Sequence, residues 1–282
     1  MQFMFEANLQ YSSTLKRAQK QNKKREKQSE AIHPKQLNAF LDESMVAGKT
    51  DLGVMEIPMN MIAGIADETE KDLYSADFLP LSPMKSAYAD QWCSLYQEYK
   101  EDKEFLSPLY CYEYLGEFYV IDGKKRVSVL KSGNASTVRA YITRIIPVAS
   151  EEKGIKLYNE FLEYFKLTGL YQVRFSKFNC FEKLQAAMGH EPDQSWNDEE
   201  RIQMLKDLMR MEEALNEAFG GYLNVTPADA ILVLLEDYSL KLVRKMAVSV
   251  MADRLQTEWK KLYSICHPDI DPCGDEIGKR AS

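Results

Sequence analysis

Three consecutive cations stand where an apolar segment ends and a helical segment begins. The apolar run 118–121 stops at Asp122-Gly123, and Lys124, Lys125 and Arg126 follow directly. The first backbone N–H groups of a helix have no partners within the helix, so they attract anions and disfavour cations. Cations at this position need a reason, and a bound anion supplies one. The pattern predicts a phosphate-binding turn between a strand and a helix.

Each residue of the turn offers a different contact to a phosphate. Gly123 has no side chain, so a ligand can approach the backbone closely. Arg126 carries a planar fork suited to bidentate phosphate contact, and lysines supply point charges. The predicted phosphate- or nucleotide-binding residues are Gly123, Lys124, Lys125, Arg126 and Ser128. Two alternatives remain open: Asp122 only caps a helix whose cations are solvated, or the cations form a docking surface for an acidic protein partner.

The elements that position this turn form an α+β unit. Apolar alternation predicts strands near 54–57, 109–115, 117–121 and 138–142, and 3–4-residue spacing of Trp92, Tyr96 and Tyr99 predicts a helix over 86–105. The order strand, helix, hairpin, helix, strand occupies residues 52–147.

The remainder of the chain is expected to be mainly helical over 148–265, with a loose tail at 266–282. Gly169 marks the end of one helix. Thr226-Pro227 marks the start of another, with threonine as the N-cap. The segments 227–237 and 240–262 are predicted as two helices separated by a short break.

The turn and its flanking segments resemble the ParB/sulfiredoxin-like superfamily. The resemblance rests on Glu56-Ile57-Pro58-Met59, on Ser107-Pro108-Leu109 and on Asp122-Gly123-Lys124-Lys125-Arg126, and it covers about a third of the chain. It is closer to ParB-like proteins than to sulfiredoxin. It implies that residues 52–147 form a domain of this fold, followed by a helical domain.

The resemblance implies binding rather than catalysis. Sulfiredoxins carry a catalytic cysteine where this chain has Lys124, so the thiol chemistry is expected to be absent. ParB proteins bind cytidine triphosphate with Gly-Glu-Arg-Arg; Gly123 and Arg126 match that turn, whereas Lys124 replaces its acid. The resemblance implies a nucleoside triphosphate ligand, with or without Mg²⁺, and a regulatory protein rather than a metabolic enzyme. Only weak triphosphatase activity would fit, and a nuclease is not expected because no carboxylate cluster suggests two metals.

The charge of the chain is unevenly distributed. Its 282 residues carry a net charge of −7, which excludes a generally basic nucleic-acid binder. Residues 1–36, however, contain eight Lys or Arg against three Asp or Glu. This basic segment is either a flexible or helical solvated tail with little to hold it to a core, or an arm that contacts DNA or RNA together with the Lys-Lys-Arg turn.

The chain has the composition expected of a cytoplasmic protein. Five unpatterned cysteines indicate reduced thiols, no apolar run approaches a membrane span, and residues 1–30 do not resemble a secretory signal. Neither a membrane nor a metal is expected as a partner, because Cys266-His267 and Cys273 lack the paired spacing of structural zinc sites.

Two further patterns allow nucleic-acid contact but have simpler explanations. The aromatic residues at 110, 112, 114, 118 and 119 could stack bases, although such residues on hairpins usually form cross-strand pairs. The segments 227–237 and 240–262 could read DNA as a helix-turn-helix through Lys241, Arg244, Lys245 and Arg254, or they could form a packing hairpin.

Overall fold

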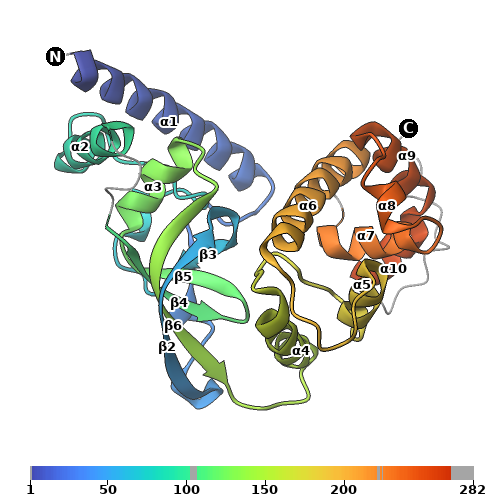
Figure 1. Ribbon diagram of the computed structural model, residues 1–282. Coiled ribbons are helices and arrows are strands. Elements are labelled where there is room, and N and C mark those ends of the chain that lie inside the picture. Colours follow the sequence, from blue (N-terminus) through green and yellow to red (C-terminus); the bar gives the residue numbers. More distant parts are fainter. Residues whose placement is uncertain (1, 102–106, 221–222, 224, 268–282) are drawn as a thin grey trace. The chain divides into compact units, whose positions relative to one another are not determined.

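The computed structural model describes residues 2–101, 107–220, 223 and 225–267. The chain divides into two compact units, Met1–Ser150 and Glu151–Ser282. The first unit combines a sheet with helices and the second is helical, so the protein belongs to the mixed α and β class (Figure 1). The predicted loose tail lies, apart from residues 266 and 267, outside the described residues.

The first unit is built on a six-stranded mixed sheet in the order β1-β3-β5-β4-β6-β2. Strands β4 and β5 form an antiparallel hairpin, β6 pairs with β4 in parallel, and the long β2 pairs antiparallel with β6. Strands β1, β3 and β5 pair in parallel. The strands are β1 (Lys35–Gln36), β2 (Val46–Pro58), β3 (Ile62–Ile65), β4 (Leu109–Tyr114), β5 (Glu117–Asp122) and β6 (Thr137–Pro147).

Three helices gather on one side of this unit: α1 (Gln2–Lys27), α2 (Ala87–Glu101) and α3 (Lys124–Ser132) (Figure 1). Helix α2 buries Trp92, whose indole N–H donates to the Ser128 hydroxyl of α3 over 3.0 Å. A second, smaller core lies at the other face of the sheet, where Leu37 covers Tyr114, Tyr119 and Ile145.

Helix α1 corrects the expectation of an unanchored basic tail. Ala7, Tyr11, Thr14 and Ala18 recur at 3–4-residue spacing and are buried, and the Tyr11 hydroxyl donates to the Ser82 carbonyl over 2.8 Å. Small and hydroxylated residues make this buried stripe. Because these residues have low hydropathy, the buried stripe is hard to recognise in a lysine-rich sequence, although its residues recur with a regular helical period.

The second unit consists of seven helices among the described residues. Two predicted helix boundaries are confirmed: Gly169 ends α4 at a φ of 67°, and Thr226 caps α7 in a reciprocal capping box with Asp229, with Pro227 at the first helical position. The helices are α4 (Lys153–Thr168), α5 (Cys180–Met188), α6 (Asp198–Phe219), α7 (Pro227–Leu235), α8 (Leu240–Val243), α9 (Val248–Thr257) and α10 (Trp259–Cys266).

The predicted long helix 240–262 is wrong, because three short helices occupy this stretch. The Arg210 guanidinium on α6 donates to the carbonyl oxygens of Arg244 and Met246. Those carbonyls lie in the bend between α8 and α9. An external donor thus satisfies backbone acceptors that a continuous helix would satisfy internally.

Candidate functional site

The predicted phosphate turn has the local geometry that its sequence suggests. Strand β5 ends at Asp122, and Gly123, at a φ of 98°, is the N-cap of α3. A Cβ at Gly123 would lie 2.5 Å from Leu109 Cδ2, so glycine is required by both backbone and space. The capping role predicted for Asp122 is wrong, since Gly123 is the cap and no side chain caps this helix.

Lys124 points into the protein and not toward a ligand. Its side chain is only 7% exposed, and its Nζ donates to the Thr69 carbonyl over 2.8 Å. Asp67 lies 3.6 Å from the same Nζ. Hydrogen bonds from Thr69 lower the pKa of the Asp67 carboxyl, and the Lys124 charge lowers it further. Lys124 therefore holds the loop at residues 67–69 against the start of α3.

The guanidinium group of Arg126 contacts backbone carbonyl groups of a neighbouring segment. Nη1 donates to the carbonyl oxygens of Ser107 and Pro108 over 2.6 and 2.7 Å, and Nη2 contacts Asp122 Oδ2 over 2.6 Å. The guanidinium thus fastens the chain entering β4 to the turn that leaves β5. Its capacity for bidentate recognition is occupied within the protein.

Lys125 and Ser128 complete the predicted set but do not join a common site. Lys125 Nζ donates to Gln91 Oε1 and lies 5.1 Å from the centre of the Tyr88 ring. Ser128 is fully buried and accepts from Trp92. The five predicted residues therefore do not converge on one site. The two side chains best suited to bind phosphate, Lys124 and Arg126, already contact other parts of the protein.

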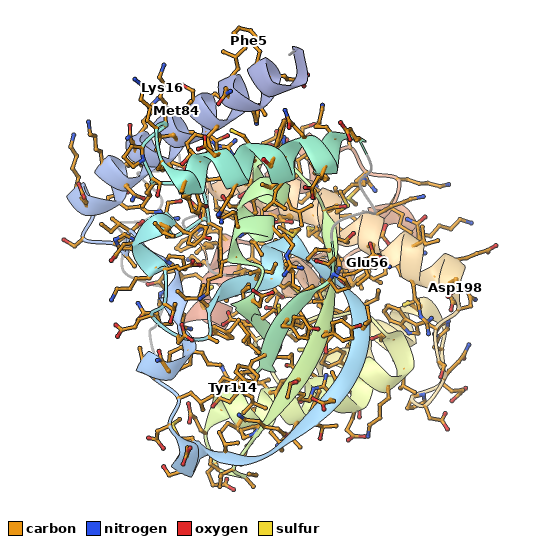
Figure 2. All side chains as sticks on the ribbon, turned by 90° about the vertical axis from the view of Figure 1, so that its left-hand side faces the viewer. Phe5, Lys16, Glu56, Met84, Tyr114 and Asp198 are labelled. Atoms are coloured by element: carbon orange, nitrogen blue, oxygen red, sulfur yellow. The ribbon has the colours of Figure 1, made fainter. Side chains whose placement is uncertain are left out.

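The exposed face of α1 is rich in cations. Six exposed cations occupy about 120° of the helix circumference, opposite the buried stripe. None of them makes an ion pair with another described residue. Figure 2 shows Lys16 projecting outward from this face, together with Phe5 near the start of the helix. The cations are Lys16, Arg17, Lys20, Lys23, Lys24 and Lys27.

This basic face was only partly foreseeable. The charge excess of residues 1–36 is visible in the sequence. Arg25 nevertheless does not belong to the face, because it pairs with Asp77 over 3.1 Å. Projection of the cations on a helical wheel would have separated them from Tyr11 and Ala18.

The aromatic residues of the β4–β5 hairpin divide between core and surface. Tyr114, Phe118 and Tyr119 are buried. Tyr110 is exposed and stacks on Tyr141 of β6, a residue that was not among those expected to stack bases. Strand alternation in the sequence already places Tyr141 on the side opposite Ala140 and Ile142, but no local signal pairs it with Tyr110.

The cations proposed for a helix-turn-helix have mixed environments. Arg244 Nε contacts Asp207 over 2.7 Å, and Arg254 lies over the Tyr238 ring at 5.9 Å. Lys241 and Lys245 lie at and just beyond the four-residue α8. The break between α8 and α9 divides the predicted second helix, so these four cations do not lie on one continuous helix.

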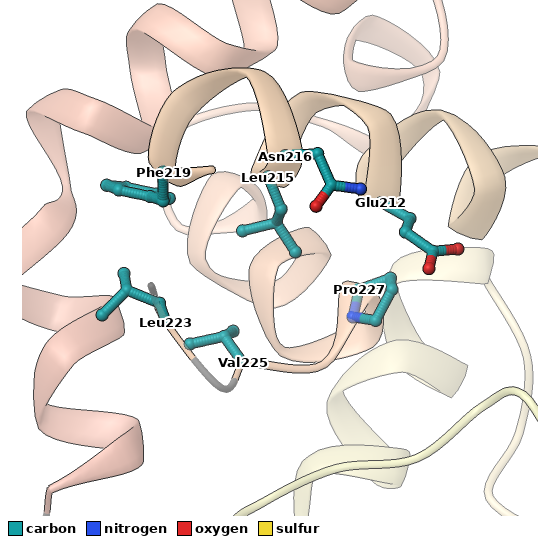
Figure 3. Close-up of a pocket in the computed structure, with 7 residues that line it drawn as sticks. All are labelled: Glu212, Leu215, Asn216, Phe219, Leu223, Val225 and Pro227. Atoms are coloured by element: carbon teal, nitrogen blue, oxygen red, sulfur yellow. The ribbon is translucent and has the colours of Figure 1, made fainter. Parts of the chain in front are cut away.

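Two hollows lie in the described part of the second unit. The one in Figure 3, about 140 Å³, is lined mostly by apolar side chains, among them Leu215, Phe219 and Val225, with the Glu212 carboxylate and the Asn216 amide at one side. A hollow of about 470 Å³ between α5, α6 and α8 contains acids and bases together. The first is smaller than common ligand pockets. In the second, Glu200 pairs with His190 at 2.8 Å and Arg244 pairs with Asp207 at 2.7 Å.

The described part of the chain contains buried thiols and no cluster of potential metal ligands. No group of three or more His, Cys, Asp or Glu side chains there could hold a metal ion. Burial raises the pKa of the Cys93 thiol to about 11 and that of Cys111 to about 12, so both stay protonated at neutral pH. Over the same residues, no helix combines the length and apolar character that a membrane crossing needs.

Comparison with known proteins adds no family to this description. No protein-family model matches the chain, and no curated protein matches it in sequence.

Proposed function

We propose that this protein binds nucleic acid through the exposed basic face of α1, by contact with the phosphate backbone. The observation that carries the proposal is the set of six exposed cations on one ordered helix, none of them ion-paired with a described residue. The whole chain has a net charge of −7, so this positively charged face differs in sign from the protein as a whole.

The anchoring of α1 makes the face suitable for a rigid partner. Tyr11 and Ala18 are fully buried, so the cations are presented on a fixed helix. From Lys16 to Lys27 they extend over about 16 Å, since each helical residue rises 1.5 Å. A duplex carries about one phosphate charge per 1.7 Å of axis, so about ten phosphates lie within that length. Contacts of this kind position a duplex without reading its sequence.

The test is a salt series of duplex binding. A fluorescently labelled duplex of mixed sequence is titrated with the full chain between about 50 and 200 mM salt. Neutralising Lys16, Lys20, Lys23 and Lys27 to Gln should flatten the log–log salt slope by about 3 to 4, because each phosphate contact contributes about 0.9.

The matched control changes the same number of exposed lysines in the second unit: Lys153, Lys177, Lys183 and Lys206 to Gln. This control should leave the slope near its original value. Equal losses in both variants, or binding to anionic lipid vesicles without binding to duplex, would contradict the proposal.

A phosphate- or nucleotide-binding role at the 122–126 turn is the second candidate. The strand, the positive φ of Gly123 and the uncapped start of α3 favour it, together with the resemblance of this turn to ParB-like proteins. In this version Lys125 would contact the phosphates, and Lys124 and Arg126 would have to leave their present partners. Titration calorimetry with CTP, ATP and GTP, with and without Mg²⁺, tests it; no heat at millimolar concentration of any of them would reject it.

A further inference from the structure

The sheet face opposite the helices is rich in tyrosine and only half covered. Tyr114 and Tyr119 are buried under Leu37 at one end. At the other end Tyr110 and Tyr141 are 49% and 43% exposed. Alternation along β4 sends the buried Leu109 and Cys111 to the helix side, so Tyr110 faces outward.

Tyr110 and Tyr141 form a stacked pair at this open end. They are register partners in the parallel β4–β6 pairing, with ring centres 4.9 Å apart and planes inclined by 17°. The two rings contact each other through one face each. The row continues to exposed Val54, the partner of Tyr141 on β2, and to Asp122, the partner of Tyr110 on β5.

Both cations and acids lie near the stacked pair. Lys49 lies 4.8 Å from the centre of the Tyr112 ring, and Arg139 is exposed two residues before Tyr141. Neither forms an ion pair with a described residue. Among the acids, Asp122 pairs with Arg126, Asp51 accepts from the Thr143 hydroxyl over 2.7 Å, and Glu56, the register partner of Arg139, accepts from the Thr137 hydroxyl.

We infer that this open half-face binds single-stranded nucleic acid by stacking unpaired bases on Tyr110 and Tyr141. Aromatic rings accept any base on their free faces, and Arg139 and Lys49 are placed along the same face to contact backbone phosphates. Paired bases in a duplex cannot stack in this way. The inference extends the proposed function and rests on it for the ligand class, but it uses a surface that does not involve α1.

The test compares a labelled oligothymidylate with an abasic strand of the same length, using the full chain. Both strands carry the same phosphates, so only stacking separates them. Wild type should prefer oligothymidylate by about five-fold or more, the smallest ratio that one stacked base gives. The double variant Tyr110→Ala/Tyr141→Ala should lose this preference. Tyr110→Phe/Tyr141→Phe should keep it, because the rings remain.

Two controls separate this inference from the duplex proposal. Phe178→Ala removes an aromatic side chain of similar exposure, 42%, in the second unit and should leave the preference unchanged. The four-glutamine variant of α1 should preserve the ratio of the two affinities, because α1 is not part of this surface. If that variant leaves duplex binding intact while the base preference persists, the α1 proposal fails and the stacking surface stands.

The inference fails if the wild-type protein binds the two strands with nearly equal affinity, or if it binds neither strand. It also fails if the alanine variant keeps the preference. An alanine variant that changes the sedimentation of the protein but not the ratio would show that the face is a protein interface.

Discussion

Arg126 and Asp122 form an ion pair of 2.6 Å across the turn that joins β5 to α3. The same guanidinium donates to the carbonyl oxygens of Ser107 and Pro108, which precede β4. The side chain with the best phosphate chemistry in the sequence thus fastens two segments of the first unit together.

Replacing Arg126 by Ala should destabilise the first unit. The loss should reach about 2 kcal/mol in the free energy of unfolding, because charged hydrogen bonds to the Ser107 and Pro108 carbonyls disappear. Urea denaturation measures it, and hydrogen exchange of β4 locates it. Asp122→Asn is the control and should cost less than about 1 kcal/mol, since that carboxylate is largely exposed. Unchanged stability of Arg126→Ala would instead return this residue to a ligand-binding role.

Gly123→Ala should be among the most destabilising single-methyl changes in the chain. The left-handed φ of 98° costs about 1–2 kcal/mol for an L-residue, and the new methyl would meet Leu109 at 2.5 Å. A total loss of about 2–4 kcal/mol follows when overpacking is included. Gly48→Ala is the matched control, with no heavy atom within 4 Å of the added methyl. Similar chemical-denaturation midpoints for the two variants would refute the structural requirement at Gly123.

Tyr11 and Phe5 allow a test of the α1 anchor on a single helix. Tyr11 is fully buried and meets Trp92 edge to face at 5.2 Å, whereas Phe5 is 66% exposed. Tyr11→Ala should lower stability by about 3–5 kcal/mol, as for other buried aromatic residues, and Phe5→Ala by less than about 0.5 kcal/mol. Thermal unfolding followed by near-ultraviolet circular dichroism compares them. Equal melting temperatures would mean that α1 is not part of the folded unit.

The burial of Cys111 should lower the free energy of unfolding at alkaline pH. Burial raises its pKa from 9.0 to about 12, although the nearby Arg126 charge acts in the opposite direction. Above about pH 9 the unfolded chain releases this proton while the folded chain keeps it, so stability is full below that pH and is lost as pH rises toward 12. The slope from this thiol should approach about 1.4 kcal/mol per pH unit.

Denaturation between pH 8 and 10.5, roughly the lower part of this range, provides the measurement. Cys111→Ala should reduce the slope, whatever its effect on absolute stability. Identical slopes for the wild-type and Cys111→Ala proteins would contradict the assignment.

Local features of this fold could be predicted because they depend on neighbours in the chain. The strand that ends at Asp122, the helix that follows Gly123 and the Thr226 cap of α7 all arise from residues within four positions of each other. Backbone conformation and capping are short-range, so the sequence pattern contains the information that they need.

The candidate site could not be predicted in the same way. The partners of Lys124 and Arg126 are Thr69 and Ser107, which lie 55 and 19 positions away in the chain. No local sequence pattern indicates whether folding will bring such a hydrogen-bond partner close. The same holds for Tyr110, whose stacking partner Tyr141 comes from another strand.

The sequence by itself determined a strand–glycine–helix turn, a positive excess in residues 1–36 and a helical second half. Tertiary structure alone decided which cations remain exposed. In the folded protein, Lys124 and Arg126 bind acceptors within the first unit, whereas the lysines of α1 are exposed on a helix that Tyr11 anchors. The physical reason is that formal charge belongs to a residue, whereas its availability to a ligand depends on acceptors and apolar surface that only folding brings within reach.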